Sequence, residues 1–189
     1  MFQRERLNRS AYDVLLENPQ SFINLLCLIF IWIAATFNYF LVEYYLRLIK
    51  QDLYLTMMWS AGSEIFAYVV GYCVYYHLGL IKTMFRAFLL SIVGIVTLMA
   101  YLYGIHGQEL MMIGILILTC KVGISAAIQH AYFGTISIFK PRVQGTTLGL
   151  CIGFAYLLCI FAPIMSRIDP IWLPMTIFGL FSFLGAFLS

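Results

Sequence analysis

The chain has 189 residues, of which 63% are hydrophobic and 10% are charged, and its net charge is +3. Soluble domains carry roughly 25% charged residues, so this composition excludes an ordinary soluble domain and predicts an integral membrane protein. The small net charge also excludes a nucleic-acid surface, and the lipid bilayer is the first partner that we expect.

Six apolar stretches are long enough to cross a bilayer, which takes about 20 residues in a helix because backbone polar groups must bond within the segment. We expect residues 43–52 to form the first of the short connectors between them, none of which could hold a separate domain. The sequence therefore predicts an all-α, polytopic protein with a six-helix transmembrane bundle over residues 21–189. The expected spans are approximately 22–42, 54–76, 85–103, 110–128 with an extension towards 139, 147–165 and 172–188.

The segment ahead of the first span, residues 1–20, combines basic residues with a helix signal. Ser10 followed by Asp13 resembles a capping box, and Pro19 would end the short helix that it starts. We expect this segment to lie at the membrane interface, with its arginines facing water or anionic lipid.

The basic residues are unevenly divided between the two sides of the predicted bundle. One side would carry Arg4, Arg6, Arg9, Lys82, Arg86, Lys140 and Arg142, and the other Arg47, Lys50 and Arg167. By the positive-inside rule both termini then face the cytoplasm, or the matrix in a mitochondrial inner membrane. The choice between a plasma membrane and an organelle membrane stays open.

Two ionisable residues lie deep in the predicted spans, Glu64 in the second and Lys121 in the fourth. A charge near the bilayer centre costs at least about 2.5–3.5 kcal/mol on insertion scales, so we expect both side chains to point into the protein. Two interpretations stay open. The pair could line a substrate or ion path, or it could be an acid and a base tied to each other or to backbone carbonyls.

The sequence carries no pattern typical of an enzyme. It has no phosphate-binding glycine loop, no His-Glu-x-x-His zinc motif and no Gly-x-Ser-x-Gly nucleophile elbow. Its five cysteines all fall in apolar stretches without the spacing of metal ligands, so we expect no metal and no cofactor.

Several segments, in order and over nearly the whole chain, carry a family resemblance. They are Trp32 to Tyr39 (WIAATFNY), Trp59 to Tyr68 (WSAGSEIFAY), Lys121 to Ala127 (KVGISAA) and Phe139 to Cys151 (FKPRVQGTTLGLC), with Ala162-Pro163 after them. Together they resemble the seventh, eighth, tenth and eleventh helices of the organic ion and synaptic-vesicle-like branch of the major facilitator superfamily. The chain thus resembles the second six-helix half of such a transporter, without the first half.

The resemblance implies that Glu64 and Lys121 occupy positions on helices that bound the central cavity. Its predicted cavity-lining residues are Glu64, Lys121, Asn38, Gln129 and Tyr156, and the remnant of its cytoplasmic latch is Arg142, Gly145 and Gly149. Gly145 and Gly149, followed by Gly153, also form a ridge of small residues whose first interpretation is close helix packing.

The sequence departs from the family pattern at positions that normally gate the transporter and select charge. An acid of the latch is replaced by Ser137 and an arginine by Gln144, although Arg142 is kept nearby. The eleventh-helix position that often carries a selecting charge is Tyr156.

Two functions follow from these observations. The first is half of a solute transporter for an organic ion or a sugar-like molecule, working by alternating access with a second membrane bundle. The second is a degenerate, non-catalytic subunit that stabilises a larger membrane complex, with the mitochondrial inner membrane as one setting.

Overall fold

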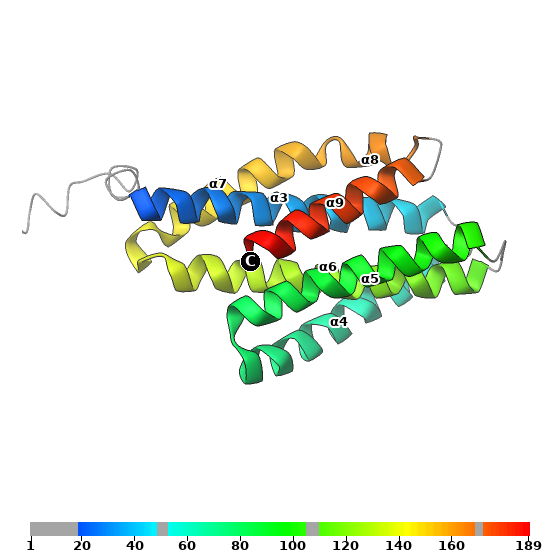
Figure 1. Ribbon diagram of the computed structural model, residues 1–189, viewed down its shortest axis with the longest axis horizontal. Coiled ribbons are helices and arrows are strands. Elements are labelled where there is room, and N and C mark those ends of the chain that lie inside the picture. The colour runs from blue at the N-terminus through cyan, green and yellow to red at the C-terminus, as the bar shows by residue number, and fades with distance from the viewer. Residues whose placement is uncertain (1–18, 49–52, 105–109, 169–171) are drawn as a thin grey trace, which may run out of the picture.

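A computed structural model of the chain describes residues 19–48, 53–104, 110–168 and 172–189. The interfacial helix expected over residues 1–20 lies almost wholly outside these described residues. Long helices run along the main axis of the molecule (Figure 1). They are α3 (Pro19–Leu48), α4 (Leu53–Leu78), α5 (Leu80–Gly104), α6 (Leu110–Ile138), α7 (Pro141–Cys159), the short α8 (Ala162–Met165) and α9 (Trp172–Leu188).

Four helical segments are long and apolar enough to cross a membrane, Pro19–Tyr44, Leu80–Tyr101, Met111–Ile138 and Pro141–Met165. This composition indicates a membrane protein. The helix α9 is apolar but has only 17 residues, and α4, with 26 residues, includes Glu64 and several tyrosines.

The helix boundaries extend beyond several expected spans. The helix α3 continues to Leu48, so the prediction that a connector begins at Glu43 is wrong. The apolar run ends near Val42, but helical backbone bonds do not require apolar side chains, and Leu, Glu and Arg all favour a helix. Likewise α7 begins at Pro141 rather than near Thr147, because proline is well suited to the first turn of a helix.

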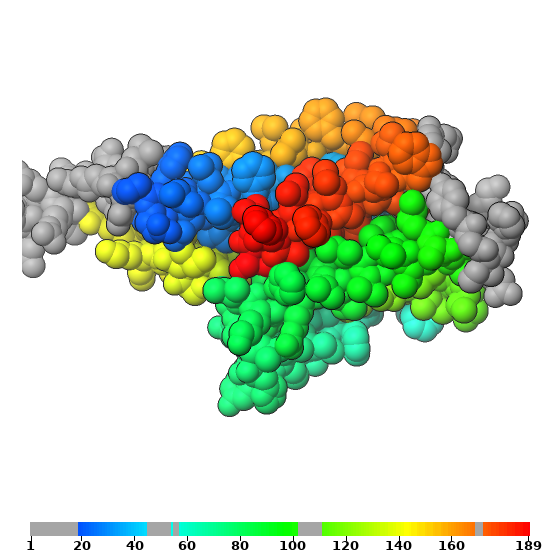
Figure 2. Space-filling model, viewed as in Figure 1, coloured from blue at the N-terminus to red at the C-terminus, as the bar shows by residue number. Residues whose placement is uncertain are grey.

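A single residue joins α4 to α5. Gly79 has a φ of +78°, and its N–H donates to the Tyr75 carbonyl at 2.9 Å, which closes the end of α4. The Thr83 hydroxyl then donates to the Gly79 carbonyl at 2.7 Å, in the first turn of α5. This turn projects from the body of the bundle (Figure 2).

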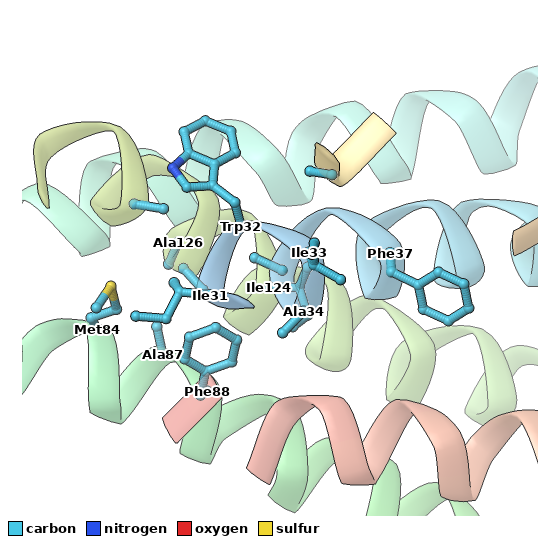
Figure 3. Close-up of a cluster of buried hydrophobic side chains, with 14 of the residues drawn as sticks. Ile31, Trp32, Ile33, Ala34, Phe37, Met84, Ala87, Phe88, Ile124 and Ala126 are labelled. Atoms are coloured by element: carbon cyan, nitrogen blue, oxygen red, sulfur yellow. The ribbon is translucent and has the colours of Figure 1, made fainter. Parts of the chain in front are cut away.

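The helix α3 is the central element of the bundle. It packs against α6, α7 and α9, and 67% of its apolar span is buried. A cluster of buried side chains from α3, α5 and α6 fills the space beside it, and Figure 3 shows part of this cluster, in which the ring of Trp32 of α3 points away from Phe88 of α5.

Glycines allow the closest approach in the bundle, where α5 meets α6. A Cβ added to Gly123 of α6 would lie 2.8 Å from the Ala87 carbonyl and would overlap the Ser91 hydroxyl. On the other side of the same interface, a Cβ on Gly94 would meet Cys120 Sγ at 2.8 Å. Small residues are what helices in lipid use to pack closely, since apolar burial gives little preference for protein over lipid.

Candidate functional site

Three charged residues of the apolar bundle, Glu43, Glu64 and Lys121, meet in one cluster where α3, α4 and α6 face one another. Lys121 of α6 is at its centre, with a side chain that is 1% exposed. Its Nζ lies 2.6 Å from Glu43 Oε2 of α3 and 2.8 Å from Glu64 Oε1 of α4. The ammonium also donates to the Ser60 hydroxyl. All three of its N–H groups therefore have an acceptor.

Two further hydrogen bonds complete this cluster, which we call the lysine cluster (Tyr39, Glu43, Ser60, Glu64 and Lys121). The Tyr39 hydroxyl donates to Glu64 Oε1 at 2.6 Å, and the Ser60 hydroxyl donates to Glu43 Oε2 at 3.2 Å. The Tyr39 ring also lies 5.1 Å from Lys121 Nζ, within the range of a cation–π contact.

Helical spacing explains how the cluster is assembled. Tyr39 and Glu43 are four residues apart on α3, and Ser60 and Glu64 are four residues apart on α4, so each pair lies on one helix face. Both faces contact Lys121 of α6. A charge buried in an apolar bundle is costly unless it is paired, and the cluster supplies that pairing.

The lysine cluster includes two of the predicted cavity residues, Glu64 and Lys121, and the structure shows them tied to each other. Sequence reasoning missed Glu43, Ser60 and Tyr39. The end of the apolar run places Glu43 in a connector, whereas its four-residue spacing from Tyr39 is the signal that puts it on the same helix face.

The other predicted cavity residues lie elsewhere. Asn38 is fully buried, and its amide donates to the Phe178 carbonyl at 3.1 Å and to Ser182 Oγ at 2.9 Å, which ties α3 to α9. Gln129 is half-buried on α6 and faces Gly71 of α4. Tyr156 is 53% exposed on α7.

The predicted latch remnant lies at the start of α7. Arg142 is exposed there, and so are Gly145 and Gly149. A Cβ added to either glycine, or to Gly153, would meet nothing within 4 Å. The interpretation of this ridge as close helix packing is therefore not met among the described residues, because the ridge faces outward.

One buried histidine, His130, lies on α6. The Nδ1 of His130 lies 2.6 Å from the Ala126 carbonyl, one turn earlier, and its ring contacts the rings of Tyr75 and Phe133. These contacts are those of a packing residue.

Comparison of the chain with protein-family models gave no match, and comparison with curated proteins gave none either. The geometry of the lysine cluster itself indicates its chemistry. It holds one ammonium and two carboxylates, with both carboxylate side chains partly exposed, at 20% for Glu43 and 24% for Glu64. A group that enters from outside meets carboxylate oxygens rather than the ammonium.

Proposed function

We propose that this chain forms one six-helix half of a major facilitator type transporter and carries a small organic ion or a sugar-like solute by alternating access with a second membrane bundle. In this proposal α4 and α9 cross the membrane together with the four longer apolar spans. Transporters of this kind contain two three-helix repeats of inverted topology in each half.

The packing of the helices is the observation that supports the proposal most. If α3 is exchanged with α6, α4 with α7 and α5 with α9, each of the main helix–helix contacts maps onto another main contact or onto itself. The α3–α7 contact becomes α6–α4, and α5–α6 becomes α9–α3, whereas α3–α6 and α5–α9 map onto themselves. The two members of each exchanged pair also run in opposite directions (Figure 1). This pattern is what two inverted repeats would give.

The position of the lysine cluster supports the same function. Substrate and coupling-ion sites in such transporters lie near the bilayer midplane, where the repeats meet. Glu64 is near the middle of α4, and Lys121 joins it to α3 of the same repeat from α6 of the other. Ionisable residues at this depth mark substrate or ion paths more often than they mark plain packing.

Solute uptake tests the proposal. The chain, purified together with its membrane partner and reconstituted in vesicles, should take up at least one member of a panel of labelled organic cations, organic anions and sugars in a saturable way. Glu64→Gln and Lys121→Met should each abolish that uptake. The matched control is Lys82→Met, because Lys82 is exposed at the start of α5 and does not belong to the lysine cluster. Unchanged uptake in both cluster variants would contradict a cavity that uses the cluster.

A second candidate function is a transporter-like subunit of a larger membrane complex. It is favoured by the hydrogen bonds of Ser137 and Gln144, the two residues that replace charged residues of the latch. The Gln144 amide donates to the Ile136 and Phe139 carbonyls at 2.5 and 2.9 Å, and the Ser137 hydroxyl donates to the Gly134 carbonyl at 3.2 Å. Both side chains bond the backbone at the end of α6 instead of forming a charged latch.

The composition of the native complex separates the two functions. Purification in mild detergent followed by mass spectrometry should find a second six-helix bundle if the chain is half of a transporter. Several unrelated subunits without such a bundle would favour the structural function.

A further inference from the structure

We infer that Thr36, Ser125 and Gln129 form the solute site of this protein, and that the solute they bind is a neutral molecule rich in hydroxyl groups. The inference deepens the proposed transport function and rests on it for the use of the site in uptake. The site itself rests on polar groups that are buried without a hydrogen-bond partner. We call these three residues the hydroxyl site.

The first observation concerns how buried hydroxyls are bonded in this bundle. Thr83, Ser91 and Thr135 each donate to the backbone carbonyl four residues earlier, at 2.7, 3.1 and 2.8 Å. Thr36 and Ser125 are 5% and 1% exposed, and among the described residues their hydroxyls have no partner. A buried polar group without a partner costs free energy, so these two hydroxyls are expected to bond to something that the bundle itself does not supply.

The two unpaired hydroxyls lie at the same level of the bundle. The helices α3 and α6 are antiparallel, because Lys121 pairs with Glu43 whereas Thr135, further along α6, accepts from the indole of the earlier Trp32 at 3.1 Å. One unpaired hydroxyl lies between these two contacts on each helix. The segments that carry them are therefore neighbours.

Helical spacing turns both hydroxyls towards the lysine cluster. Thr36 is seven residues before Glu43, and Ser125 is four residues after Lys121, so each shares a helix face with a residue of the cluster. Gln129 follows one turn after Ser125 on α6. Its Oε1 is also buried, with no hydrogen-bond partner in the part of the chain that the structure describes.

The helix α4 closes the other side of the hydroxyl site. A Cβ added to Gly71 would lie 3.1 Å from Gln129 Oε1, which places α4 beside this group. The helices α3 and α4 both pack on α6 but contact each other little. A solute would therefore enter when α4 separates from α3. Tyr68 of α4 and Tyr132 of α6 are 42% and 40% exposed, and they supply aromatic rings and hydroxyls near this opening.

The hydrogen-bonding groups of the site fit hydroxyls better than ions. The Thr36 and Ser125 hydroxyls can both donate and accept, whereas Gln129 Oε1 only accepts. A hydroxyl of the solute can match all three groups, but a carboxylate of the solute could not donate to the amide oxygen. The charges of the adjoining lysine cluster are tied to one another, so an ionic solute would have to displace one of these partners.

Equilibrium binding of sugars that differ in charge tests the inference. The protein in lipid nanodiscs with its membrane partner would be titrated with glucose, glucosamine and glucuronate, which share one ring, and with myo-inositol as a second neutral solute. We expect glucose or myo-inositol to bind, and the two charged sugars to bind much more weakly. Thr36→Val and Ser125→Ala should each weaken this binding about fivefold to tenfold, the effect of one lost hydrogen bond.

Thr119→Val is the matched control, because the Thr119 hydroxyl is exposed and bonds to the Ile115 carbonyl at 3.0 Å. It should bind the neutral sugars as the wild type does. Thermal unfolding without solute separates binding from folding. Since Thr36→Val and Ser125→Ala remove hydroxyls that have no partner in the bundle, their unfolding temperatures should equal or exceed that of the wild type.

Three results would overturn the inference. They are tighter binding of glucosamine or glucuronate than of the neutral solutes, neutral-solute binding that is unchanged in both Thr36→Val and Ser125→Ala, and no binding of either neutral solute by the folded protein. If the neutral solutes bind as expected but are not taken up into vesicles, the site stands and the transport function fails. If a solute is taken up and neither substitution affects its uptake, the transport function stands and the site fails.

Discussion

Lys121 of α6 and Glu64 of α4 approach to 2.8 Å where these two helices pack against each other. Glu43 completes the arrangement from α3, at 2.6 Å from the same ammonium. One buried cation therefore joins three helices. Because a link of this kind depends on charge rather than on apolar area, it can be strengthened or weakened by chemistry that leaves the packing intact.

The first prediction concerns the stability that Lys121 provides. Lys121→Met would leave two carboxylates without their cation, and breaking a buried ion pair in this way costs about 3–5 kcal/mol. Thermal unfolding in detergent, followed by circular dichroism, should show a large loss of stability.

A compensated variant serves as the control for that experiment. Lys121→Met combined with Glu43→Gln and Glu64→Gln carries no charge at the site and should recover most of the lost stability. A single Lys121→Met variant as stable as the wild type would show that the ion pairs contribute nothing to the bundle.

The second prediction concerns the contact between α3 and α9. Asn38→Ala removes hydrogen bonds to the Phe178 carbonyl and to Ser182, at a cost of about 1–2 kcal/mol, since each such bond contributes modestly in lipid. Asn24→Ala is the matched control, because among the described residues Asn24 accepts just one exposed bond, from Gln20 at 3.3 Å. Equal unfolding temperatures for the two variants would contradict this assignment.

The third prediction compares two glycines. Gly123→Ala places a methyl group against the Ala87 carbonyl and the Ser91 hydroxyl, and such overpacking costs about 1–3 kcal/mol. Gly153→Ala places the same methyl in open space on α7, so it should leave stability unchanged or raise it slightly. The unfolding temperatures in detergent decide this, and a loss at Gly153 that equals the loss at Gly123 would count against the α5–α6 packing.

The fourth prediction concerns topology. With the native cysteines replaced by alanine, Lys82→Cys should react with a membrane-impermeant maleimide from the cytoplasmic or matrix side, and Arg167→Cys from the opposite side. The segments α5, α6 and α7 lie between these positions, and each is long and apolar enough to cross once. Reaction of both cysteines from one side would contradict the predicted orientation.

Much of the fold could be predicted because the rule behind it is local. A helix in lipid needs a long apolar run. For most helix ends, the apolar runs in this sequence predict the boundary to within a few residues. The boundaries that failed, at Glu43, before residue 85 and before Thr147, lie where the helix continues into polar residues. Hydropathy marks where the lipid ends and not where the helix ends.

The candidate site was predicted only in part, for a related reason. Glu64 and Lys121 stand out because a charge inside an apolar run is rare. Asn38 could not be placed, since its surroundings depend on α9 lying beside α3, which no local pattern specifies. Tyr39 and Ser60 are polar residues of ordinary kind, and only their spacing from the two glutamates connects them to the site.

The most direct test of the half-transporter proposal is access to Tyr156 from the two sides of the membrane. In the cysteine-free protein with its native partner, Tyr156→Cys would be probed with an impermeant maleimide in right-side-out and inside-out vesicles. A half-transporter that lines an alternating cavity predicts labelling from both sides, with the rates shifting in opposite directions when a transported solute is added. Labelling from one side only, or from neither, would contradict alternating access and leave the structural subunit as the function of this chain.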